Sequence, residues 1–182
     1  MSIDSMLDTQ QVEPGPDTGW TAPSQRFSDW LDGLDQDSQQ KRRAIDIHLL
    51  NDLQKELAEE AAAADVPEEL FREWGFKGLV RAVGGAPAIG LFREVLHNRH
   101  LNKGTTWRPN DLTDMVYLSC AAGYADFVVC EKHMRDPLQH GLKRTGLPTR
   151  IYRRLADAVE AIEAVLETPS VPAQPVPSRS SG

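Results

Sequence analysis

The sequence predicts a mostly helical α/β domain with a small parallel sheet, and three observations support this fold class. Apolar residues recur at helical spacing over much of residues 41–101. A short apolar run at 126–130 is typical of a strand buried on both faces, and residues 149–152 form a weaker strand candidate. The helical segment between them implies a parallel pair joined by a right-handed crossover. Because two parallel strands alone make a marginal sheet, we expect this sheet to be incomplete.

Composition assigns the excess negative charge to one end of the chain. The 182 residues suit a single domain, with 27 Asp and Glu against 20 Lys and Arg and a formal net charge of −7. That total argues against a non-specific nucleic-acid binder. Residues 1–40 alone carry this −7, however, so residues 41–182 are neutral. No run approaches the ~20 apolar residues of a membrane helix, and the N-terminus does not resemble a signal peptide. We therefore expect a cytoplasmic protein.

The chain divides into one folded domain between two segments that are expected to be disordered. Residues 1–40 form an acidic arm interrupted by Pro and Gly, which buries too little apolar surface to fold by itself. The folded domain spans residues 41–167, with a helical part at 41–101 and a motif-bearing α/β part at 102–167. Residues 168–182 are rich in Pro and Ser and predict a disordered tail.

The helical part predicts three helices in order. Leucine and isoleucine at four-residue spacing predict the first over residues 41–64. Pro67 suits the start of the second, which extends to about Val83, before two glycines. Pro87 begins the third, which extends to about Leu101.

The motif-bearing part predicts a loop over residues 102–109 and then a helix. Asn110 is the expected N-cap and Gly123 the expected end of that helix. Two further helices are expected around the second strand, at residues 131–142 and 154–166. Both cysteines have apolar neighbours and predict buried thiols: Cys120 and Cys130.

Three carboxylates are expected to converge at the end of the predicted sheet. Glu131 follows the first strand directly, at the edge where open α/β sheets bind ligands. Asp111 and Asp114 lie one turn apart and are expected on one face of the preceding helix. Clustered carboxylates repel each other, and a divalent cation such as Mg²⁺ or Mn²⁺ relieves that repulsion and activates water. In the alternative interpretation, Asp111 only caps the helix and Asp114 is a solvated surface residue.

The stretch Trp107–Met134, WRPNDLTDMVYLSCAAGYADFVVCEKHM, resembles the C-terminal signature of bacterial PIN-like nucleases. That signature has a tryptophan, then N-D-x-x-D, an apolar helix, and Y-x-D-x-V-V-T-E-K. The resemblance implies a Rossmannoid fold with a parallel sheet and a metal-dependent ribonuclease with three or four acidic residues. It implies that Asp114 and Glu131 are metal ligands and catalytic residues, and that Asp111 is an auxiliary carboxylate.

Two departures from this pattern affect the expected site. Cys130 stands where the family has a threonine, so a hydroxyl near the metal is lost. The family also begins with a strand of the form Y-L-D-x-N, whose aspartate is the central metal ligand. Only Met6–Thr9, containing Asp8, resembles that strand faintly. Without a clear counterpart of that strand, we expect the chain to be half of a split protein, a truncated form or an inactive member of the family.

The charge around the motif is locally favourable for RNA. Residues 97–154 hold ten Lys and Arg against five acids, three of which are the expected metal ligands. We expect Lys132, Arg108 and Arg135 to contact phosphates. Trp107 and Tyr124 are core anchors or, alternatively, stack on bases.

The histidines offer a weaker alternative metal site. Two of them are three residues apart near a helix end, and Cys130, His133 and His140 follow the strand, but no paired second half of a zinc site is present. A scatter of surface histidines is the preferred interpretation. The sequence therefore predicts an Mg²⁺- or Mn²⁺-dependent ribonuclease, as a toxin or defence effector. The alternative is a catalytically inactive or split PIN-like protein that binds RNA or a protein. The expected partners are RNA, an antitoxin or complementary N-terminal half, and a second copy of the chain, with no membrane.

Overall fold

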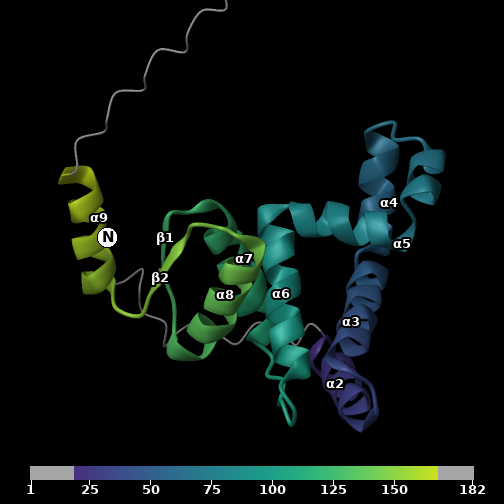
Figure 1. The fold of residues 1–182 in the computed structure, drawn as a ribbon, viewed down its shortest axis with the longest axis horizontal. Helices are drawn as coiled ribbons and strands as arrows, with labels where there is room; N and C mark the ends of the chain where they lie inside the picture. Colours follow the sequence, from purple (N-terminus) through teal and green to yellow (C-terminus); the bar gives the residue numbers. More distant parts are fainter. Residues whose placement is uncertain (1–18, 168–182) are drawn as a thin grey trace, which may run out of the picture.

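The computed structural model describes residues 19–167, apart from the side chain of Phe71, and shows a mostly helical α/β fold with a two-stranded parallel sheet (Figure 1). Helix α6 (Pro87–Leu101) lies at its centre and packs mainly against α7 (Asp111–Tyr124) and α8 (Lys132–Thr145). The bounds predicted for α6 are confirmed, and Pro87 occupies its first turn, where its missing N–H costs no hydrogen bond.

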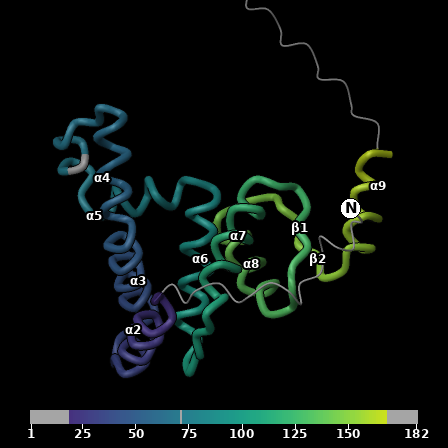
Figure 2. Tube along the Cα trace, turned by 180° about the vertical axis from the view of Figure 1, so that it is seen from behind, coloured from purple at the N-terminus to yellow at the C-terminus, as the bar shows by residue number. Residues whose placement is uncertain are grey.

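The two predicted strands are confirmed and pair in parallel. Strand β1 (Phe127–Val129) aligns with β2 (Arg150–Tyr152), and α8 connects them. The sheet lies between α9 (Leu155–Glu167) on one side and α7 and α8 on the other (Figures 1 and 2).

The prediction that the first strand is buried on both faces is wrong. Val128 is buried and pairs with the buried Ile151, but the next residue, Val129, is 40% exposed. Successive side chains of a strand point to opposite faces, and α9 leaves the second face partly open. Five large apolar side chains of α9 itself are also exposed: Leu155, Val159, Ile162, Val165 and Leu166.

Residues 19–40 are ordered, so the predicted disordered arm does not extend over them. Helix α2 (Thr21–Gly33) buries Leu31 completely and packs on α6. Aromatic side chains supply apolar surface here despite the acidic composition: Trp20, just before α2, packs edge-on against Trp107, and Phe27 of α2 packs edge-on against His100. Residues 1–18 and 168–182, including the rest of the arm, Asp8 and the predicted tail, lie outside the described residues.

The helix predicted over residues 41–64 is two helices. Helix α3 (Ser38–Asp52) begins at Asp37, which forms a capping box with Gln40. Leu53 separates α3 from α4 (Gln54–Ala63). Helix α5 (Glu68–Gly85) follows and is kinked at Gly75, whose φ of 55° is unfavourable for residues with a side chain. Helix α4 and the part of α5 before this kink project from the body of the molecule, and the rest of α5 runs back to α6 (Figures 1 and 2).

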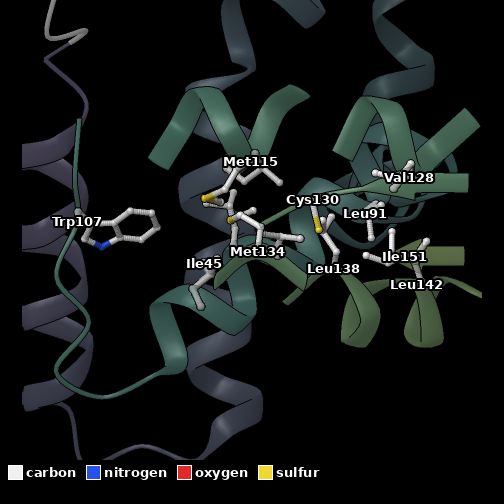
Figure 3. Packing of buried hydrophobic residues seen from close by; sticks show 14 of the residues in the cluster. Ile45, Leu91, Trp107, Met115, Val128, Cys130, Met134, Leu138, Leu142 and Ile151 are labelled. Atoms are coloured by element: carbon white, nitrogen blue, oxygen red, sulfur yellow. The ribbon is translucent and has the colours of Figure 1, made fainter. Parts of the chain in front are cut away.

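The main hydrophobic core lies between α6, α7, α8 and the sheet (Figure 3). Leu91 of α6 and Leu138 of α8 are fully buried there. Of the two cysteines, Cys130 belongs to this core, whereas Cys120 is exposed on α7, so the prediction of a buried thiol is wrong for Cys120.

Helices α6 and α7 approach closely at Gly123. A Cβ built at this position would lie 2.8 Å from the backbone nitrogen of Ala88 and 2.9 Å from its Cα. The prediction that Gly123 ends the helix is wrong, because α7 continues to Tyr124. The glycine is needed for the close contact between the two helices.

Candidate active site

Two of the three predicted carboxylates lie together at the end of β1, with a histidine between them. Asp114 is in the first turn of α7, and Glu131 is the N-cap residue of α8, two residues after β1 ends. The Nε2 of His133 lies 3.7 Å from Asp114 Oδ2, and its Nδ1 lies 3.3 Å from Glu131 Oε2. The side chains of Asp114, Glu131 and His133 are 43%, 84% and 45% exposed. The group is therefore open to solvent.

Local structure explains why Glu131 reaches this position. The N–H of Cys130 donates to Tyr152 O at 3.0 Å, which extends the strand pairing to the residue before Glu131. The extended backbone of Glu131 then turns the chain into α8. Because α7 leads into β1 through a short connection, its first turn lies near the end of the strand, and Asp114 meets His133 there.

Asp111 does not join this pair. It is buried, and its Oδ2 accepts hydrogen bonds from the guanidinium of Arg99 and from the backbone N–H of Arg108 at 2.8 Å. The prediction that Asp111 and Asp114 present both carboxylates on one face is wrong, because Arg99 of α6 holds Asp111 inside the molecule. Asn110 occupies the predicted N-cap position of α7, but its side chain makes no capping hydrogen bond.

The three predicted phosphate contacts differ in their surroundings. Lys132 and Arg108 are exposed. Arg135 is half-buried, and its Nε is buried without a hydrogen-bond partner among the described residues. Burial raises the pKa of the neighbouring Cys130 thiol despite the positive charge of Arg135. Arg135 is thus the one of the three that is enclosed by the fold.

The prediction of surface histidines is confirmed for His133 and His140, which are exposed, but it is wrong for the pair on α6. His97 and His100 are fully buried on α6, where each has a hydrogen-bond partner. Trp107 is likewise a core residue, whereas Tyr124 is exposed. Among residues 19–167, no group of three or more His, Cys, Asp or Glu side chains is placed to hold a metal ion by itself.

Sequence reasoning missed a buried group of charges between α3 and α6. Arg93 donates to both carboxylate oxygens of Asp46, at 2.6 and 2.9 Å, and to Glu94 at 3.0 Å. His97 Nε2 donates to Asp46 at 2.8 Å. Glu94 also pairs with Arg42 and with Arg144. The sequence signal is the presence of Arg93, Glu94 and His97 among and beside the apolar residues of the segment Leu91–Leu96 of α6.

These contacts keep both carboxylates ionised. Burial by itself would raise the pKa of Asp46, but the hydrogen bonds from His97 and Arg93 outweigh it and lower the pKa to about 2. Burial acts likewise on Glu94, and His97 and Arg42 lower its pKa to about 2. Each carboxylate is therefore already paired with arginines, whereas Asp114 and Glu131 lie beside His133.

The surface beside this buried group is hollow and basic. A cavity of about 760 Å³ lies between α3, α5, α6 and α8. A second cavity of about 450 Å³ shares Arg42 and Arg144 with it.

Searches against protein-family models, curated proteins and solved structures found no match. Within the described part of the chain, no helix is long and apolar enough to cross a membrane.

Proposed function

We propose that this chain is a PIN-like ribonuclease that hydrolyses RNA phosphodiesters with Mg²⁺ or Mn²⁺ at Asp114 and Glu131. The observation that carries the proposal is the meeting of these two carboxylates, from separate elements, at one solvent-open imidazole. The resemblance of Trp107–Met134 to the family signature assigns the same two residues. A cytoplasmic location remains part of the proposal.

The two carboxylates fit a hard divalent cation. Mg²⁺ in proteins often uses one or two carboxylates and completes its octahedral shell with waters and substrate phosphates. Both carboxylates are exposed enough to accept such a shell, and their recorded charged neighbour is a histidine rather than an arginine. When bound, the ion would activate water and stabilise negative charge on the phosphodiester.

The chain's own residues would position the RNA. The two nitrogens of His133 face one carboxylate each, so the imidazole lies between Asp114 and Glu131. Lys132 is the first residue of α8, next to Glu131, and Arg108 lies in the loop just before α7, the helix that carries Asp114. Both side chains are exposed, so they can contact phosphates there.

A second candidate function is a binding module without catalysis, acting on RNA, on an antitoxin or on a complementary N-terminal half. Two observations favour it. Asp111 is held by Arg99, so two carboxylates stand where the family has three or four. No strand precedes β1 within residues 19–167, so that region supplies no counterpart of the strand with the family's central aspartate.

RNA cleavage in Mn²⁺ by the full chain separates the two functions. We expect Asp114→Asn and Glu131→Gln each to reduce cleavage by about 10²-fold or more, the scale typical of removing a catalytic acid–base group. Asp126→Asn removes an exposed carboxylate just before β1 and is the matched control, expected to cleave like the wild type.

The proposal is contradicted if both variants cleave RNA as fast as the wild type. If the wild type binds RNA but cleaves none of a panel of single-stranded and structured RNAs in Mn²⁺ or Mg²⁺, the binding module is the correct function.

A further inference from the structure

The basic cavity between α3, α5, α6 and α8 has an unusual charge balance. Its lining includes five cationic side chains and one carboxylate, that of Asp46. The cationic residues are Arg42, Arg43, Lys77, Arg93 and Arg144. None of the cavity's lining residues belongs to the Asp114–Glu131–His133 group.

The buried carboxylates fix some of these cations and leave others available. Arg93 uses Nε and both terminal nitrogens in its contacts with Asp46 and Glu94. Arg144 gives Glu94 only its Nε, at 2.7 Å, and its side chain is 58% exposed. Its terminal nitrogens have no recorded partner within the described chain. Glu94 therefore orients the guanidinium of Arg144 and leaves its outer edge facing solvent.

Arg43 and Lys77 provide two further exposed cations on facing helices. Arg43 lies on α3, and its guanidinium carbon is 5.4 Å from the centre of the Phe76 ring on α5. This contact holds Arg43 beside the cavity without using its hydrogen-bond donors. Lys77 follows Phe76 directly, lines the same cavity and is exposed.

The adjoining cavity extends this basic surface. It shares Arg42 and Arg144 and adds Lys143 from α8. With Glu94 and Asp46 counted as ionised, the six cations exceed the two carboxylates by four charges. A concave surface of one sign attracts a ligand of the opposite sign, and guanidinium groups match the oxygens of phosphate.

We propose that this basic cavity binds phosphate groups of a single-stranded RNA backbone, as a second site that anchors the strand. Arg43, Lys77 and Arg144 make the contacts, whereas Asp46 and Glu94 act as positioning residues for the arginines. The choice of RNA as the source of phosphate rests on the proposed function. The expectation that the cavity binds phosphate rests only on its cationic lining.

Binding of fluorescein-labelled single-stranded RNA in EDTA, measured by anisotropy at several salt concentrations, tests this site without cleavage. We expect Arg43→Gln with Lys77→Gln to reduce the slope of log K against log salt by about 1.4, since each phosphate contact on a single strand contributes about 0.7. Arg144→Gln alone should reduce the slope by about 0.7. Inorganic phosphate should compete with RNA for the wild type.

The matched control is Arg26→Gln with Lys55→Gln, which removes the same charge from side chains outside both cavities. We expect this control to bind with the wild-type slope. The proposal is overturned if the Arg43/Lys77 variant binds like the wild type, or if the control loses as much affinity. It is also overturned if a mononucleotide binds this cavity more tightly than the RNA strand.

The outcomes separate this site from the proposed catalytic one. In an Asp114→Asn, Glu131→Gln background, Arg43→Gln with Lys77→Gln should still reduce the salt slope in EDTA by about 1.4. If RNA binding depends on the cavity but the wild type cleaves no RNA, the proposed nuclease function is refuted and the phosphate-binding cavity is supported. If cleavage depends on Asp114 but RNA binding does not depend on the cavity, the nuclease function is supported and the phosphate-binding cavity is refuted.

Discussion

A buried hydrogen-bonded chain of three side chains fixes α2 against α6. Trp107 Nε1 donates to Ser28 Oγ at 2.8 Å, and Ser28 Oγ lies 2.8 Å from His100 Nδ1. Burial, assisted by the charges of His48, His97 and Arg99, lowers the pKa of His100 to about 3, so its imidazole is neutral at physiological pH. The tautomer of this imidazole determines which of Ser28 Oγ and His100 Nδ1 is the donor.

Two serines on α2 offer a matched test of this chain. Ser28→Ala leaves the buried groups of Trp107 and His100 without their partner, so we expect it to lower the free energy of unfolding by about 1–3 kcal/mol. Ser24 is one turn earlier and equally buried, but its hydroxyl has no partner among the described residues. Ser24→Ala should therefore be neutral or slightly stabilising in urea unfolding. Equal losses in both variants would show that the chain contributes nothing.

Buried titratable groups predict a loss of stability in acid in two stages. His100 binds a proton below about pH 6.5 when unfolded but only near pH 3 when folded, so stability falls as pH drops through this interval. Asp46 and Glu94 have lowered pKa values, so their contribution is present above about pH 4.5 and is lost as the pH falls toward 2. Urea unfolding at pH 7.5, 5.5 and 4 measures the first stage. His100→Gln should flatten the decline between pH 6.5 and 4.5, and an unchanged decline would contradict this account.

At the scale of elements, the contact between α6 and α7 depends on the missing side chain of Gly123. A methyl group there would overlap the backbone of Ala88, which cannot move as a flexible side chain does. We expect Gly123→Ala to lower the free energy of unfolding by about 1–3 kcal/mol. Gly33→Ala, at the end of α2, meets nothing within 4 Å and should be neutral or stabilising in the same urea titration. A neutral Gly123→Ala would mean that the two helices are not in close contact.

Elements with a strong local signal were predictable from sequence. Pro87 and the apolar spacing that follows it define α6, and the apolar run before Glu131 defines β1. Composition predicted disorder over α2 because residues 1–40 as a whole are acidic and contain Pro and Gly, while the aromatic residues there gain their partners only from α6 and the loop after it. The break at Leu53 was missed because the apolar spacing continues across it.

The same distinction applies to the candidate site. Asp114 and Glu131 were predictable because strand order and helix position alone bring them to one edge. The burial of Asp111 was not predictable, because its partner, Arg99, lies on another helix and no local sequence pattern indicates this pair. The buried group at Asp46 escaped prediction for the same reason: its partners are 47 and 51 residues away in the sequence.

At the scale of the whole molecule, burial is distributed unevenly. Helix α6 contributes eight buried residues, whereas none of the ten residues of α4 is buried. Segments with few buried contacts open at lower free energy than the core. In hydrogen–deuterium exchange we therefore expect the amides of α4 to exchange faster than those of α6. Equal protection in both helices would contradict this uneven stability.

The central claim is that Asp114 and Glu131 form one open site for a divalent cation. The most direct measurement is the broadening of amide NMR signals when substoichiometric Mn²⁺ is added to the full, ¹⁵N-labelled chain. We predict that signals around Asp114 and Glu131 broaden first, that Asp114→Asn with Glu131→Gln abolishes this effect, and that Asp126→Asn preserves it. Broadening centred elsewhere, or unchanged in the double variant, would contradict the claim.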